Sequence, residues 1–146
     1  MKKVICAILI LVIIAGAFCV WYIPNMPEYT LHSMMKSIKQ DGITAIEPYL
    51  TDNMLLIYQG ARVVTENPFL QSLIPTDYAS QFFDIMSDVS LEWEFEGVER
   101  TRSTAVATLN VICDSFSGLI DLDMVRVDKQ WLISNISLSA ATLTLD

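Results

Sequence analysis

The sequence has few residues of the kinds that usually carry chemistry. It contains one histidine, three cysteines and five glycines among 146 residues. Cys6 and Cys19 lie in an apolar N-terminal run, so Cys113 is the only cysteine of the remaining chain and has no partner there for a disulfide. No glycine-rich phosphate loop, paired-cysteine metal site or nucleophile elbow occurs. We therefore expect no metal and no cofactor.

Basic residues are also scarce. The chain has 9 lysines and arginines against 17 acidic residues. Lys2 and Lys3 precede Pro27 and every acidic residue follows it, so the part after Pro27 has 9 − 2 = 7 basic residues and a charge of 7 − 17 = −10. This charge disfavours binding to nucleic acid and to anionic lipid, and it is compatible with a cationic partner.

One long apolar run is present at the N-terminus. Lys2 and Lys3 precede uncharged residues 4–23, and Pro24 ends the run. About 20 apolar residues are enough to cross a bilayer as a helix. The two lysines place the N-terminus in the cytoplasm and the rest on the extracytoplasmic side. Residues 1–26 are therefore predicted to be a membrane segment.

Two other fates of this segment remain open. Ala15-Gly16-Ala17 is a signal-peptidase type of site, and cleavage there would release the protein. Lipidation of Cys19 is the third alternative, which the bulky Phe18 disfavours. An uncleaved anchor is preferred because the run continues past the point where a signal peptide ends. All three deliver residues 27–146, a normal single domain, across the membrane.

The stretch from Val89 to Leu138 predicts an antiparallel sheet. Apolar and polar residues alternate along four runs, which begin at Val89, Thr104, Leu119 and Gln130. Gly97 breaks the phase of the first run and suggests a bulge. The last two runs are joined by a tight connection at Asp128-Lys129. The result is a curved meander with one apolar face that needs a cover, while both faces of the second strand are expected to be partly covered.

The helices that precede the sheet are predicted to supply that cover. Pro27 opens a helix that ends at Asp41-Gly42. Its core stripe consists of Leu31, Met34, Met35 and Ile38, and its polar face of Glu28, His32, Lys36 and Lys39. A shorter helix follows through Ile43, Ile46 and Leu50.

The middle of the chain is less clear. Residues 52–64 fit a helix with Asp52 as its N-cap, but Val63-Val64 favours a strand or the end of the helix. A further helix is predicted from Thr76 or Asp77 to about Ser87, with Phe82, Phe83 and Met86 on its apolar face.

Two local patterns carry a resemblance to a known family. The run from Met124 to Ile133, with Trp131 just after the tight turn, is similar to the closing hairpin of the nuclear transport factor 2-like superfamily. Pro27-Glu28-Tyr29-Thr30-Leu31, with Met35, Ile38 and Asp41, resembles the first helix of small extracytoplasmic members without an assigned function. This chain departs from the pattern at Lys129, where many members have glycine.

The resemblance implies a cone-shaped α+β fold. In that superfamily a curved sheet wraps around a long first helix and leaves a pocket at the open end. Some members, such as the ketosteroid isomerases and SnoaL-like cyclases, are enzymes, whereas many others only bind or dimerise. The fold alone does not choose between these functions.

Several residues are candidates for chemistry. Asp84, Tyr58 and Asn110 are the candidates for acid, base or oxyanion donor in a pocket enzyme. A hard cation is conceivable at Glu92, Glu94 and Glu96 with Asp121 and Asp123, but a solvated strand face is the better interpretation. His32 is expected on a solvated helix face, and Cys113 is expected to be buried and inert.

The sequence favours a binding function over catalysis. We expect a membrane-tethered extracytoplasmic binding or assembly module that holds an apolar ligand, a peptide or a second copy of itself. The expected contact residues, in the pocket or on the sheet face, are Trp93, Phe95, Leu122, Met124 and Trp131. The alternative is a small isomerase- or cyclase-like enzyme acting on an apolar substrate.

Overall fold

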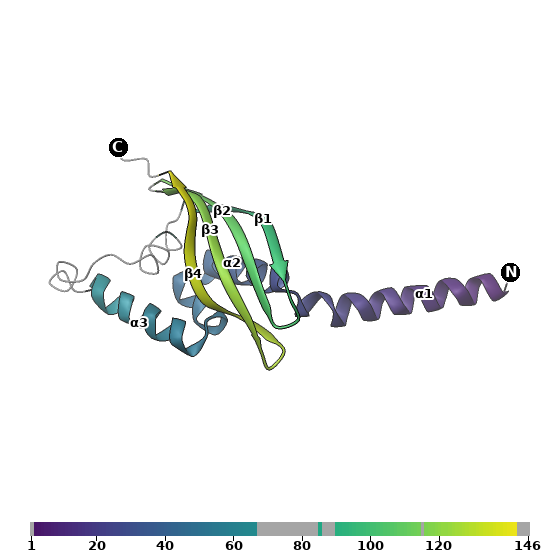
Figure 1. Cartoon of the computed structure of the whole chain (residues 1–146). Helices are drawn as coiled ribbons and strands as arrows, with labels where there is room; N and C mark the ends of the chain where they lie inside the picture. Colours follow the sequence, from purple (N-terminus) through teal and green to yellow (C-terminus); the bar gives the residue numbers. More distant parts are fainter. Residues whose placement is uncertain (1, 67–84, 86–89, 115, 143–146) are drawn as a thin grey trace.

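The computed structural model describes residues 2–66, 85, 90–114 and 116–142 (Figure 1). These residues form an α+β architecture in which the helices precede an open antiparallel sheet, as the sequence predicts. The elements are α1 (Lys2–Trp21), η1 (Ile23–Asn25), α2 (Pro27–Asp41), η2 (Ile43–Tyr49), α3 (Asp52–Glu66), β1 (Glu92–Arg100), β2 (Thr104–Cys113), β3 (Phe116–Val127) and β4 (Gln130–Thr142).

Helix α2 forms as the sequence predicts. Pro27 occupies its first position, where a missing N–H costs nothing. The helix ends at Gly42, whose φ of 84° suits glycine and whose N–H donates to the Ile38 carbonyl at 2.9 Å. The predicted stripe of Leu31, Met34, Met35 and Ile38 is buried. This stripe is the part of the helical layer that faces the sheet.

The two elements after α2 differ in part from expectation. The predicted short helix is a 3-10 helix, η2, with Pro48 inside it and Ile46 buried. Residues 52–66 form an α-helix, so the strand alternative for residues 63–64 is wrong. The cap is Thr51 rather than Asp52, because the Thr51 hydroxyl accepts from the Met54 amide at 3.5 Å. The helix predicted over residues 76–87 lies outside the described residues, apart from Ile85, which is helical and buried.

The four strands lie in the order β1-β2-β3-β4 and every neighbouring pair is antiparallel. This is the predicted meander. Strands β3 and β4 are longer than predicted, since β3 begins at Phe116 and β4 continues to Thr142. The extra residues pair with each other, as shown by Ser117 opposite Thr142.

Bulges bend the sheet at three places. The register of β1 against β2 shifts between Phe95 and Gly97, which confirms the predicted bulge. Two further shifts lie between β3 and β4, where Ser134 and Ser139 are the extra residues of β4. The Ser134 hydroxyl donates to the Asp123 carbonyl at 3.1 Å and so satisfies one polar group of its bulge. The resulting curvature is visible in Figure 1.

The β3–β4 hairpin closes through the two residues predicted for it. Val127 pairs with Gln130, which leaves Asp128 and Lys129 as the loop. Their φ values of 49° and 70° are those of a type I′ turn, which matches the twist of the strands. Aspartate tolerates this conformation, whereas lysine adopts it at a conformational cost.

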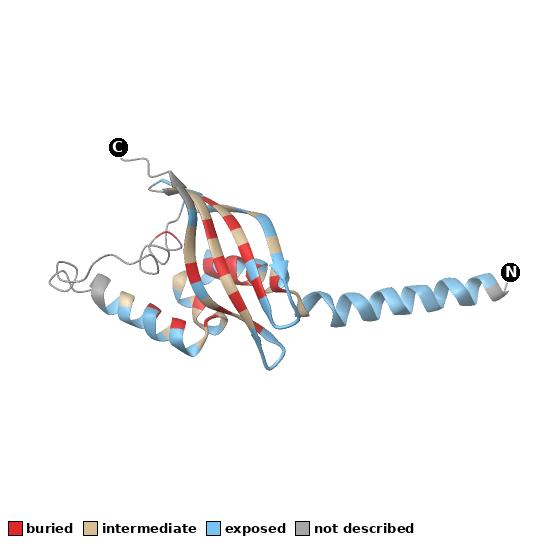
Figure 2. Cartoon of the chain, viewed as in Figure 1, coloured by how far each residue is buried: buried red, intermediate tan, exposed pale blue. Residues whose placement is uncertain are grey.

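The core lies between the helices and the inner face of the sheet (Figure 2). The alternating residues Ala105, Ala107, Leu109 and Val111 of β2 are buried there. On the other face of β2, Val106 is 40% and Ile112 is 49% exposed. Thr108 and Asn110 on this face are half-buried, so the expected partial cover is present at the middle of the strand and is lacking at Val106 and Ile112 within the described structure.

Helix α1 stands apart from the domain as a single projecting helix (Figure 1). The apolar segment Val4–Asn25 has a mean hydropathy of 3.0 and none of it is buried. Twenty helical residues span about 30 Å, the thickness of a bilayer core. By length and composition this helix can cross a membrane, and it is equally compatible with a signal anchor.

Candidate binding site

The five predicted contact residues divide into two groups. Leu122 and Met124 are completely buried in the core, so they offer no free surface in the described structure. Trp93 and Phe95 on β1 are half-buried, and their rings meet edge to face at 5.2 Å. Trp131 is 4% exposed and lies at the other edge of the sheet, on β4. Their role in ligand binding stays a prediction.

His32 occupies the predicted exposed face of α2 but also has a specific neighbour. Its ring meets the Trp93 ring at a centroid distance of 5.7 Å and an angle of 63°. The edge-to-face contact joins α2 to the outer strand β1. The histidine is thus a packing residue at the border of the core.

The structure separates the candidates for catalysis. Tyr58 is buried in the core on α3, where burial raises the pKa of its phenol. Asn110 lies on the opposite face of the sheet, between Glu94 and Leu119 in the strand register. Asp84 lies outside the described residues. Tyr58 and Asn110 therefore cannot act on one common atom.

The carboxylates of the sheet lie on its outer face, as predicted. Glu92, Glu94 and Glu96 are exposed along β1. Asp121 accepts from the Thr108 hydroxyl at 2.6 Å, and Asp123 accepts from the Asn135 amide at 3.0 Å. Among the described residues no three acidic, histidine or cysteine side chains are grouped to hold a metal ion.

Cys113 is half-buried rather than buried. It is the last residue of β2, pairs with Phe116 at the start of β3 and packs against the border of the core. The inward phase of a strand predicts burial only in the middle of a sheet.

A cleft of about 420 Å³ opens where α2, η2 and the start of β4 meet. It is lined by Pro24, Tyr29, Thr30, Ser33, Pro48, Tyr49, Lys129, Gln130, Trp131 and Leu132. Its volume falls in the range of small ligand sites. The lining combines three aromatic rings with hydroxyls, an amide and one cation, Lys129.

The sequence contains only a weak signal for this cleft. Trp131 was expected to bind, but the other lining residues were not. Thr30 and Ser33 are small polar residues one helical turn apart, next to the core stripe of α2. Small side chains leave space beside a helix, so this pair is the sequence feature that corresponds to the cleft. Tyr29, which is 47% exposed, supplies an aromatic wall.

The cleft meets the outer edge of β4, which pairs with no further strand among the described residues. The Thr51 amide donates to the Ile133 carbonyl at 3.0 Å, and Leu50 forms a parallel bridge with Ile133. The Ile133 carbonyl therefore points away from β3. Because alternate residues of a strand direct their backbone groups to the same side, those of Trp131 point to this edge as well. The edge at Trp131 can accept a further extended segment.

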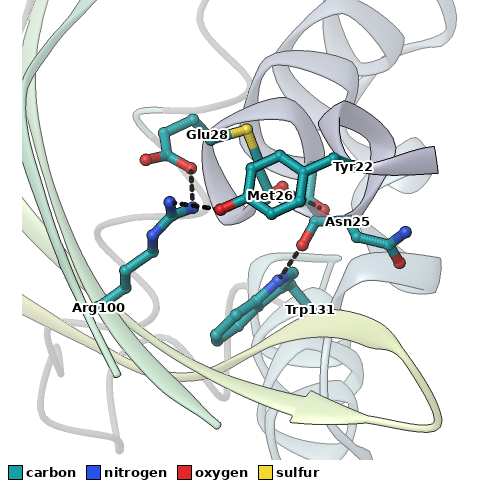
Figure 3. A network of polar contacts seen from close by, with 7 residues as sticks. Tyr22, Asn25, Met26, Glu28, Arg100 and Trp131 are labelled. Carbon is teal, nitrogen blue, oxygen red and sulfur yellow. Dashed lines mark hydrogen bonds and ion pairs between the residues drawn. The ribbon is translucent and has the colours of Figure 1, made fainter. Parts of the chain in front are cut away.

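A polar network joins the residues that follow α1 to both edges of the sheet (Figure 3). The Arg100 guanidinium donates to the Tyr22 hydroxyl at 3.2 Å and lies 3.7 Å from the Glu28 carboxylate. On the other side the Trp131 indole N–H donates to the Asn25 carbonyl at 2.8 Å. The cleft thus lies beside the point where the apolar helix joins the domain.

Together these features define a class of protein: an α+β domain carried on one N-terminal apolar helix, with an open cleft at the junction. Comparison of the chain with protein-family models, with curated proteins and with solved structures finds no match.

Proposed function

We propose that the protein is a membrane-tethered binding module whose cleft takes an extended peptide segment by adding it to the free edge of β4. Main-chain hydrogen bonds to a sheet edge supply affinity in this mode, and neighbouring side-chain pockets supply specificity. The proposal assigns no catalytic step to the cleft. The pocket-enzyme alternative has no support from the placement of Tyr58 and Asn110.

One observation carries the proposal. The chain itself already places an extended segment on this edge, because Leu50 and Thr51 pair with Ile133. The cleft continues from that point toward the hairpin and includes residues 129–132 of β4 and the turn before it. A peptide there would extend the same pattern by bonding to the backbone of Trp131.

The lining favours a peptide over the other expected ligands. A small apolar molecule is best held in an enclosed apolar pocket, whereas this cleft is open and its polar groups include Thr30, Ser33 and Gln130. A second copy of the chain would bring a domain of charge −10 against another of the same charge. Aromatic rings such as Tyr29 have an apolar ring and a polar hydroxyl, so they can contact both apolar and polar side chains of a peptide.

Two further parts of the interpretation belong to the proposal. The position of the domain outside the cytoplasm is supported by Lys2 and Lys3 before the apolar run. Membership of the nuclear transport factor 2-like superfamily, with its cone, is supported by α2 lying against a bent antiparallel sheet and by the closing hairpin before Trp131.

The test is selection of binding peptides from a random library displayed against the full chain in lipid nanodiscs. Selected peptides are expected to lose affinity by about tenfold or more on Tyr29→Ala, because removing an interface aromatic typically costs over 1 kcal/mol. Ser33→Trp, which fills the cleft, is expected to abolish binding.

Two matched variants control for general effects. Leu56→Ala removes an exposed apolar side chain on α3, away from the cleft, and Thr108→Trp adds an indole to the outer sheet face. Both are expected to bind as the parent does. Peptides that bind Ser33→Trp as tightly as the parent, or a selection that enriches none, would contradict the proposal.

A further inference from the structure

The basic residues of the domain are concentrated at one end of the sheet. The two hairpin ends, residues 100–103 and 126–129, carry Arg100, Arg102, Arg126 and Lys129. These are four of the seven basic residues that follow Pro27 (9 − 2 = 7), whereas only one of the 17 acidic residues, Asp128, lies there. The hairpin ends are therefore positive in a domain that is otherwise strongly acidic.

This end of the sheet lies beside the junction with α1 (Figure 1). Trp21 and Tyr22 lie at the end of the apolar run, and aromatic residues of this kind mark the membrane–water boundary. Tyr22 accepts a hydrogen bond from Arg100, the first residue of one hairpin end. The second end is tied to the first, because the Arg126 amide donates to the Ser103 carbonyl at 2.8 Å. Both hairpin ends are thus held near Tyr22, at the end of the helix that is proposed to cross the membrane.

Three of the four cations are available for an outside partner. Arg102, Arg126 and Lys129 are exposed, and within the described part of the chain none of them has an ion-pair partner. Arg100, in contrast, is engaged with the Glu28 carboxylate and the Tyr22 hydroxyl. Lys129 stands in a left-handed conformation that glycine would adopt without strain. The backbone conformation at this position favours glycine, yet the residue there carries an exposed positive charge.

We infer that the two hairpin ends form a docking surface for the anionic lipid headgroups around α1. The phosphate groups of the leaflet are the partner that exposed cations at headgroup level fit. The net charge of the domain disfavours such a contact, but the segregation of its charges reverses this locally. Docking would hold the domain, with its acidic outer sheet face, in one orientation to the membrane. Of the four cations only Lys129 also lines the cleft, so Arg102 and Arg126 can be tested independently of what the cleft binds.

The test uses the full chain in nanodiscs of phosphatidylcholine, alone or mixed with phosphatidylglycerol. A fluorophore is attached at Ser103→Cys, with the three native cysteines replaced by alanine, and is quenched by a lipid spin-labelled at its headgroup. Quenching is expected to be stronger in the anionic discs and to fall as salt is added. Arg102→Gln with Arg126→Gln is expected to lower the ratio of docked to undocked protein in anionic discs about 25-fold, at about fivefold per cation.

Two controls isolate the effect of position. Lys36→Gln with Lys39→Gln removes the same charge from the exposed face of α2 and is expected to leave quenching unchanged. A fluorophore at Asp114→Cys, at the opposite end of the sheet, is expected to be insensitive to phosphatidylglycerol. Equal quenching at Ser103 in both kinds of disc would overturn the inference, as would a double arginine variant that behaves like the parent.

Discussion

At Lys129 the backbone conformation that the hairpin requires differs from the conformation that lysine prefers. The two-residue hairpin requires positive φ at both loop positions, and the sheet register leaves no room to avoid it. Asparagine or aspartate followed by glycine satisfies this without strain, and Asp128 fits the first position. Lysine in the left-handed region costs about 1–2 kcal/mol. The packing of β3 and β4 is strong enough to bear this cost.

Lys129→Gly is therefore expected to stabilise the domain. The free energy of unfolding should rise by about 1 kcal/mol, since relief of the left-handed conformation exceeds the greater chain entropy of glycine. Urea unfolding in a mild detergent, followed by near-ultraviolet circular dichroism, measures it. The same substitution at Lys36, in an exposed helical position, should cost about 1 kcal/mol. A loss of stability in Lys129→Gly would contradict the strained turn.

Tyr58 provides a second prediction, which concerns pH. Burial raises the pKa of its phenol above the ordinary value of 10.0, with a contribution from Glu47 that Arg62 opposes. Above pH 10.0 the unfolded chain gives up this proton while the folded protein still holds it, so stability falls as pH rises. Below that pH both states keep the proton and Tyr58 adds no pH dependence.

Tyr58→Phe should flatten the alkaline loss of stability. The free energy of unfolding is measured at neutral pH and at a pH above 10.0, and the decrease between them should be smaller in the variant. Tyr29→Phe, at an exposed ring, is the matched control and should keep the parental decrease. An identical decrease in Tyr58→Phe and the parent would show that the folded protein ionises as readily as the unfolded chain.

At the scale of the elements, α2 is the helix on which the sheet depends. Its stripe is buried from Leu31 to Ile38, and the helix contacts β2 in the middle of the sheet. Leu31→Ala is expected to lower the free energy of unfolding by about 2–5 kcal/mol, because the removed methyl groups leave a cavity. Lys36→Ala on the opposite face should change it by less than about 0.5 kcal/mol. Comparable effects of the two would refute this packing.

The same helix shows why part of the fold is predictable from sequence. A stripe at helical spacing in α2, and period-two alternation in β1 and β2, each repeat one physical pattern over several residues. The shifts at Ser134 and Ser139 were not predicted, because a single extra polar residue in an alternating strand has no distinctive composition. Residues 63–64 differ from the strand alternative for another reason: valine has high strand propensity, but this propensity is weak in comparison with context, and here both valines continue α3, where Val63 is 58% exposed.

The candidate site was harder to predict than the fold. The expected contact residues have large apolar side chains. Such side chains also form the core, and Leu122 and Met124 are buried there. The cleft is made instead by residues from separate elements, such as Tyr29 and Lys129, which become neighbours only after folding. No local pattern marks such a set.

At the scale of the whole molecule, apolar, basic and acidic residues are segregated into different parts of the structure. The long apolar run outside the core forms helix α1. The basic hairpin ends lie beside the junction of α1 with the domain, together with the cleft. The acidic residues of the sheet lie on its outer face. The network of Tyr22, Arg100 and Trp131 ties these parts together. The proposed membrane tether would therefore hold the cleft next to the bilayer.

This arrangement requires that α1 stays on the mature protein. The mass of the protein purified from membranes should correspond to a chain that still contains residues 2–21, and alkaline extraction should leave it in the membrane fraction. A mature N-terminus at Phe18, directly after the Ala15-Gly16-Ala17 site, would show that the segment is a cleaved signal.

Site-specific photo-crosslinking in the native membrane tests the proposed binding function most directly. A photoreactive phenylalanine analogue replaces Ser33 in the cleft of the full chain, and the same analogue replaces Thr108 on the outer sheet face as the matched control. We expect adducts from Ser33 to a defined polypeptide segment, lost when Tyr29→Ala is added, and no such adducts from Thr108. Adducts to lipid alone, or equal labelling from both positions, would contradict a peptide-binding cleft at the edge of β4.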